Sequence, residues 1–159
     1  DYTANKHLVP EGVTVTTYSD ALILPGFIDT HVHYPQTQII GAYGKQLIDW
    51  LNNYTFIAEQ QFANPEHGHE VAKVFLRECA RAGTTTAMVY CTVYPQSVDA
   101  FFEAALADGA TIRGEPGVWT QYSERYYAAF VNDLHGNNVE AVWHAPGSIT
   151  DAPRRPGVP

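Results

Sequence analysis

Two histidines separated by one residue, His31 and His33, are the residues of this chain whose type and spacing could do chemistry. They follow an apolar run over residues 21–28, and such runs bounded by turn residues are typical of buried strands. Side chains two residues apart in a strand point to the same side, so Asp29, His31 and His33 would share one face. Two imidazoles on one face can both reach one divalent metal ion. The sequence therefore predicts half of a metal site.

Spacing alone leaves a second interpretation open, in which both histidines are hydrogen-bonded polar residues at the end of a strand. A zinc site needs three or four ligands, and only two are placed here. Asp29 is a candidate third ligand or, preferably, a group that orients one imidazole. Double-stranded β-helix metalloproteins also carry H-x-H on a strand, with a Glu four or five residues after the second His. Those positions hold Thr37 and Gln38, which argues against that class.

The other five histidines have weaker claims to a site. His67 and His69 also form an H-x-H, but they stand at the start of an expected helix, where residues two apart diverge by about 200°. We expect both to be exposed. The remaining three histidines are His7, His135 and His144, and no predicted helix or strand orients their side chains.

Composition limits the classes of partner. The net charge of −8 argues against a nucleic-acid polymer, which binds clustered Lys and Arg, but it does not exclude a neutral nucleobase. No apolar run of eighteen residues and no basic-then-apolar leader occurs, so neither a membrane nor an export signal is predicted and a cytoplasmic location is the default. Cys79 and Cys91 are expected to be two reduced, buried thiols rather than a disulfide.

The elements that must position the histidines alternate between buried strands and amphipathic helices. A second strand is predicted over residues 84–93, and helices are predicted over 45–54, 65–82 and 98–108. This alternation predicts an α/β fold with a parallel sheet, either a (β/α)₈ barrel or an open doubly wound sheet. No G-x-G-x-x-G or Walker loop follows either strand, which removes the usual nucleotide-binding version of the open sheet.

The two ends of the chain are less regular. Val13–Thr17 is β-branched and could form one strand. Residues 112–119 could form a third strand, although Gly114, Pro116 and Gly117 interrupt it, and residues 122–134 are compatible with a helix. Periodicity disappears from Gly136 onwards, and the proline-rich tail over 152–159 is expected to be disordered.

Residues 24–33, L-P-G-F-I-D-T-H-V-H, resemble the first barrel strand of the amidohydrolase superfamily, whose H-x-H supplies two ligands of the catalytic metal. Within that superfamily the chain resembles the guanine deaminases. Several separate stretches carry this likeness in order, namely residues 34–36, 40–51, 54–56, 83–87 and 93–105. The resemblance covers about residues 18–106.

The resemblance implies zinc-dependent hydrolytic deamination of guanine to xanthine and ammonia, a step of purine catabolism. It implies one zinc per subunit held by His31 and His33, a homodimer in the intact protein, and a substrate-contacting segment made of His33, Tyr34, Pro35 and Gln36. Gln36 is chemically apt, because an amide both donates and accepts hydrogen bonds, as a purine edge does. The alternative for Gln36 is an amide that caps a loop.

The resemblance also implies parts that this sequence does not supply. A (β/α)₈ barrel needs about 250 residues, and the family's later histidines, aspartate and H-x-x-E glutamate have no match after residue 109, so no catalytic proton shuttle is placed. We expect a remnant of an N-terminal β-sandwich over 1–20, the first β/α units of an amidohydrolase barrel over 21–109, and a divergent, poorly ordered segment over 110–159. The chain is expected to be truncated and inactive alone. The alternatives are a non-catalytic fragment, or an amidohydrolase that acts on another aminated heterocycle.

Overall fold

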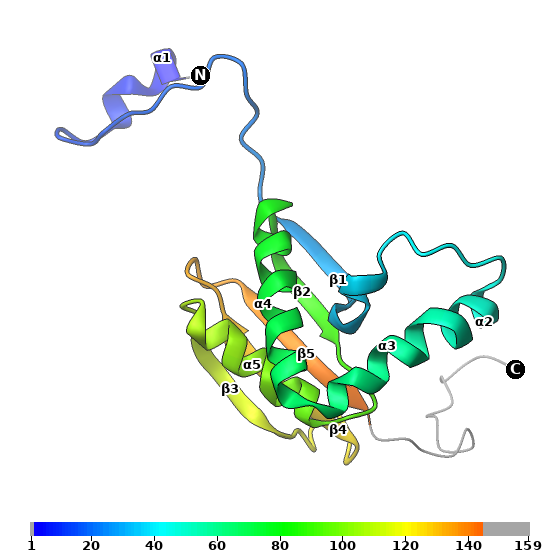
Figure 1. Ribbon diagram of the computed structural model, residues 1–159. Coiled ribbons are helices and arrows are strands. Elements are labelled where there is room, and N and C mark those ends of the chain that lie inside the picture. Colours follow the sequence, from blue (N-terminus) through cyan, green and yellow to red (C-terminus); the bar gives the residue numbers. More distant parts are fainter. Residues whose placement is uncertain (1, 145–159) are drawn as a thin grey trace, which may run out of the picture.

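The computed structural model describes residues 2–144, which are organised around one five-stranded sheet (Figure 1). The strand order is β1-β2-β5-β4-β3. The strands are β1 (Phe27–His33), β2 (Thr84–Tyr90), β3 (Thr111–Val118), β4 (Tyr126–Asn132) and β5 (Asn138–His144). β1, β2 and β5 run parallel, whereas β4 is antiparallel to both β5 and β3. The predicted α/β class is therefore confirmed, but the sheet is mixed rather than parallel throughout.

Two helices cover one face of this sheet, α4 (Pro65–Arg81) and α5 (Gln96–Ala107) (Figure 1). Pro65 opens α4 where its missing N–H costs nothing, and the Asn64 side chain accepts the backbone N–H of Glu66 at 3.0 Å. Gly83 ends the helix with a positive φ of 78°, a conformation that other residues rarely adopt. Both helices lie where the sequence predicts them.

A largely helical segment, interrupted by one loop, joins β1 to α4. It consists of η2 (Tyr34–Ile39), α2 (Leu47–Trp50), the π-helical turn η3 (Leu51–Thr55), α3 (Phe56–Gln60) and η4 (Gln61–Ala63), with a loop over residues 40–46. The helix predicted over 45–54 thus exists but runs on to residue 63. In Figure 1, α2 and α3 extend away from the end of β1. A π-helical turn inside such a segment is rare and often marks a functional site.

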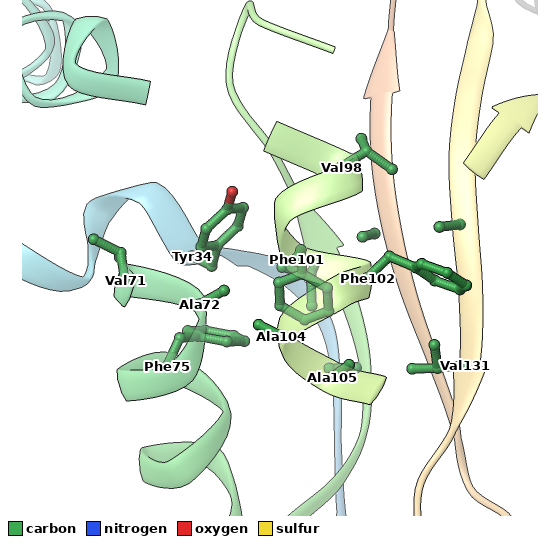
Figure 2. Close-up of a cluster of buried hydrophobic side chains, with 14 of the residues drawn as sticks. Tyr34, Val71, Ala72, Phe75, Val98, Phe101, Phe102, Ala104, Ala105 and Val131 are labelled. Atoms are coloured by element: carbon green, nitrogen blue, oxygen red, sulfur yellow. The ribbon is translucent and has the colours of Figure 1, made fainter. Parts of the chain in front are cut away.

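The core lies between α4, α5 and the covered face of the sheet. Figure 2 shows Tyr34, Phe75 and Phe101 meeting there, and the ring centroids of Tyr34 and Phe101 are 5.3 Å apart. The Tyr34 hydroxyl is fully buried and donates to the carbonyl oxygen of Ser97 at 2.7 Å. The strands contribute small and β-branched side chains to this core: Ala87, Val89, Ala129, Val131 and Ala141.

The N-terminal end differs from the prediction. α1 (Tyr2–Asn5) and η1 (Lys6–Leu8) are short helical turns, and no strand forms over Val13–Thr17. The apolar run over residues 21–28 is exposed rather than buried, with Leu22 86% and Ile23 82% accessible. Strand pairing begins only at Phe27, whose N–H donates to the Gly83 carbonyl, and Phe27 stays 59% and Ile28 69% exposed within β1. The predicted β-branched strand is wrong because no neighbouring strand pairs with it. The assignment of residues 1–20 to an N-terminal β domain stays a prediction.

The second half of the sheet corrects two further expectations. Residues 126–132 form β4 instead of the helix predicted over 122–134, because pairing with β3 and β5 on both sides overrides local helix preference. The strand predicted over 112–119 is confirmed as β3, where a Cβ on Gly114 would lie 2.5 Å from the Trp119 ring. β5 forms where no regular structure was expected after Gly136. The proposed boundary at residue 109 stays a prediction, and the proline-rich tail lies outside the described residues.

The helices of the described region are also informative about membrane spans. Within residues 2–144, no helix has both the length and the hydropathy needed to cross a bilayer.

Cys79 and Cys91 are free thiols, as predicted. Burial raises the pKa of the Cys79 thiol to about 11, with a smaller contribution from the Asp29 carboxylate. Burial also raises the pKa of Cys91 well above its usual range.

Candidate metal centre and adjoining cavity

β1 brings the two histidine rings together. The Nε2 atoms of His31 and His33 lie 3.2 Å apart, and the ring centroids are 5.1 Å apart. Tyr90 of the neighbouring strand β2 packs against both rings, with centroid distances of 4.4 Å to His31 and 5.1 Å to His33. The alternation of the strand therefore aims both imidazoles at one side of the sheet, as predicted from their spacing.

The separation of the two nitrogens fits two ligands of one metal ion. Zn–N bonds of about 2.0–2.1 Å in a tetrahedral site place neighbouring ligand nitrogens about 3.3–3.4 Å apart. Burial, followed by the charge of His31, lowers the pKa of His33. A lowered pKa favours the neutral imidazole, which is the form that can coordinate a metal. The pair thus fits two positions of a zinc-type site.

Asp29 does not occupy a third position. Its carboxylate accepts the backbone N–H of His31 at 3.0 Å, so it holds the main chain rather than an imidazole. The pairing of β1 with β2 shifts register between Asp29 and Val32, which breaks the simple alternation on which the sequence prediction relied. Within residues 2–144 no cluster of three or more His, Cys, Asp or Glu side chains is placed to hold a metal.

The predicted substrate-contacting segment divides into two parts. Tyr34 and Pro35 are buried, and Tyr34 uses its hydroxyl on Ser97, so both serve the core. His33 and Gln36 are half-buried and line a common cavity of about 300 Å³. The structure therefore places two of the four predicted substrate-contacting residues in the wall of one cavity.

This cavity lies at the carboxyl ends of the parallel strands. Its walls come from β1, from the helical segment that contains η3 and α3, from the loop after β2, and from the end of β5. In α/β folds ligands bind at this end of the strands, because the loops that follow them converge there. The lining residues with polar side chains are His33, Gln36, Thr55, Glu59, Tyr90, Thr92 and His144.

Five of these residues were not identified as site residues from the sequence. Tyr90 and Thr92 lie at the end of the strand predicted over residues 84–93, and the other three lie outside the predicted helices and strands. Thr55 and Glu59 fell beyond the end of the predicted helix, although their spacing of four would have placed both on one helical face had the helix been extended. His144 ends β5, a strand with no visible sequence signal, and it packs edge-on against Tyr126 at 4.8 Å. Only the extension of the helix offered a sequence signal.

A family model described as the amidohydrolase family matches residues 22–144. The chain belongs to the amidohydrolase family. This membership accords with the α/β architecture and with the H-x-H at the end of β1.

Individual members of the family show a closer likeness. The chain is 51% identical over 100 residues to guanine deaminase from Escherichia coli (strain K12), which covers 63% of this chain and 23% of that protein. A solved structure of E. coli guanine deaminase superposes with a TM-score of 0.59 at 48% identity, over 67% of this chain and 25% of the other. The guanine deaminase from Bradyrhizobium japonicum gives a TM-score of 0.57 at 36% identity, over 67% of this chain and 22% of that one. The chain thus spans about a quarter of the length of the relatives it matches.

Proposed function

We propose that this chain is part of a metal-dependent guanine deaminase, in which His31 and His33 provide two ligands of a catalytic zinc ion. The observation that carries this proposal is the 3.2 Å separation of the two Nε2 atoms at the carboxyl end of β1. The likeness to guanine deaminases supports the substrate. Zinc, a place in purine catabolism, a cytoplasmic location and a homodimeric intact protein belong to the same proposal. An amidohydrolase of another aminated heterocycle is the alternative.

The chemistry divides between the metal and the protein. When held by His31 and His33, a divalent metal would supply Lewis-acid chemistry, which lowers the pKa of water as hydrolytic deamination requires. His31 and His33 would hold the metal through Nε2, and Tyr90 restricts the rotation of both rings by packing against them. The lowered pKa of His33 favours its neutral form. Gln36 lines the cavity next to His33 and offers both a donor and an acceptor to the purine edge.

The two histidines do not complete a catalytic site within the described residues. A catalytic zinc site has three protein ligands and an open position for water, and deamination also needs a group that delivers a proton to the leaving amine. We therefore expect the purified 159-residue chain to release no ammonia from guanine, even with added zinc. Turnover by this chain that His31→Ala abolishes would contradict the fragment hypothesis.

A chimera tests the proposed function directly. Residues 18–106 would replace the corresponding segment of E. coli guanine deaminase, which supplies the rest of the barrel. We expect the chimera to convert guanine to xanthine with zinc bound, and His31→Ala or His33→Ala to lower both the zinc content and the rate. His67→Ala, in the other H-x-H, is the matched control.

Two outcomes of this experiment contradict the proposal. If the chimera folds and binds zinc without deaminating guanine, the substrate assignment fails, and a panel of aminated heterocycles then tests the alternative. If His31→Ala and His33→Ala both keep full zinc occupancy, the assignment of the ligands fails.

A further inference from the structure

We propose that Thr55 and Glu59, together with Gln36, form the wall that selects the ligand of the cavity beside His33, and that this wall recognises a purine with adjacent N–H donors. The inference rests on the proposed function, because it names the recognition residues of the same site. It places them on the helical segment after β1 rather than on the strand itself.

Thr55 is the first part of the argument. Its residue is only 2% exposed, yet its hydroxyl oxygen is buried without a hydrogen-bond partner among the described residues. A buried hydroxyl without a partner costs free energy, so such groups are rare unless a ligand or water completes them. Thr55 is the last residue of the π-helical turn η3 and lines the cavity. The hydroxyl is therefore free to bond a molecule placed there.

Glu59 is the second part. It lies one helical turn after Thr55, on α3, and lines the same cavity. Burial raises the pKa of its carboxyl group, while a hydrogen bond from the Gln36 side chain opposes that rise. An ionised carboxylate only accepts hydrogen bonds. Glu59 therefore adds an acceptor to the wall of the cavity.

The hydrogen-bonding groups of the wall determine which ligand it favours. The Glu59 carboxylate accepts, while the Gln36 amide and the Thr55 hydroxyl can each accept as well as donate. The wall is thus rich in acceptors. Guanine presents adjacent donors at N1–H and its 2-amino group, whereas adenine presents an acceptor at N1. The same wall therefore favours guanine and disfavours adenine, whose N1 lone pair would face an acceptor.

Equilibrium dialysis of the full 159-residue chain with radiolabelled guanine and adenine tests this assignment. We expect guanine to bind at least about tenfold more tightly than adenine. Thr55→Val keeps the shape and removes the hydroxyl, so it should weaken guanine binding about fivefold to tenfold without lowering the melting temperature. Glu59→Gln replaces an acceptor-only group with an amide that also donates, so it should reduce the preference for guanine over adenine to about twofold or less.

Matched substitutions at exposed positions serve as controls. Thr111→Val and Glu103→Gln make the same chemical changes at exposed positions outside the cavity, so neither should alter binding. Unchanged melting of Thr55→Val alongside weaker binding distinguishes recognition from a structural role.

Each remaining outcome overturns the inference. Guanine binding that both cavity variants leave unchanged removes Thr55 and Glu59 from recognition, while the proposed function stands. Failure of the chain to bind either purine shows that these residues do not form the wall in this chain. That failure is distinguishable from a failure of the proposed function, which the chimera decides through zinc content and xanthine formation.

Discussion

The two faces of the sheet carry different kinds of side chain. The face under α4 and α5 is lined by alanine and valine from β2, β4 and β5, and it packs against aromatic rings of the helices. The opposite face carries His31, His33, Tyr90, Tyr126 and Glu140. Since successive residues of a strand point to opposite sides, one run of sequence supplies both the apolar core and the polar groups.

The open face is not simply a solvated surface. Trp119 lies edge-on over Phe130 with centroids 4.7 Å apart, and its indole N–H donates to the Ala128 carbonyl at 2.9 Å. Tyr126 donates to the carboxylate of Glu140, a residue that is only 9% exposed. Both faces of the sheet therefore contain buried residues, and the degree of burial alone does not distinguish them. The covered face is buried by apolar contact, whereas the open face holds polar groups that pair with one another.

Phe101→Ala should produce the largest effect, on the covered face. Phe101 is 1% exposed and packs against Tyr34 and Phe75. Removing a buried aromatic ring costs about 3–5 kcal/mol of unfolding free energy. Urea denaturation followed by circular dichroism would measure this loss. Phe27→Ala is the matched control, because Phe27 is 59% exposed, and a loss there as large as at Phe101 would contradict the comparison.

The thiol of Cys79 offers a second test of the covered face. Its pKa is raised from 9.0 to about 11, so the reactive thiolate at pH 8 is about a hundredfold scarcer than in the unfolded chain. Iodoacetamide should therefore alkylate the native protein far more slowly than the urea-denatured protein. Because the folded-state pKa is the higher one, this contribution to stability is constant at neutral pH and is lost as the pH rises above about 9. Equal alkylation rates in the two states would show that Cys79 is not shielded.

The sequence predicted the elements whose signals are local. α4 has a proline at its start, a glycine after its end and an apolar stripe between them, and β2 is a β-branched apolar run. The shared side of His31 and His33 followed from the two-residue period of a strand. The resemblance, rather than the spacing, turned that pair into an expected metal site, because two ligands alone fit several classes.

The sequence could not predict features that depend on distant partners. The sequence over residues 122–134 predicts a helix when taken alone. β4 forms there as a strand because β3 and β5 pair with its two edges. Asp29 accepts the backbone N–H of His31 beside a register shift in the pairing with β2, and the sequence reveals neither feature. Thr55 and Glu59 line the cavity only because η3 and α3 lie beside the carboxyl end of β1.

Tyr34→Phe should lower stability by an intermediate amount. It tests whether this residue of the predicted substrate segment serves the core or the ligand. The substitution keeps the ring in the core but removes the hydroxyl that donates to the buried Ser97 carbonyl at 2.7 Å. The loss of this one hydrogen bond costs about 0.5–1.5 kcal/mol. Thermal unfolding would measure the loss. Tyr43→Phe, at a site where the residue is 79% exposed, should leave stability unchanged. A Tyr34→Phe chain that keeps wild-type stability but loses guanine binding would move Tyr34 from the core to the ligand.

His31→Ala should have the smallest effect on stability and tests whether the open face binds a metal. His31 is exposed, so its removal opens no cavity and should leave the melting temperature nearly unchanged. It does remove one of the two nitrogens that lie 3.2 Å apart, so the affinity of the 159-residue chain for Co²⁺ or Zn²⁺ should fall at least about tenfold. Titration calorimetry with either metal would measure this change, and His7→Ala, at another exposed histidine, should have no effect. A His31→Ala chain that unfolds more easily yet binds metal as before would reverse the comparison, because the open face would then serve the fold rather than the metal.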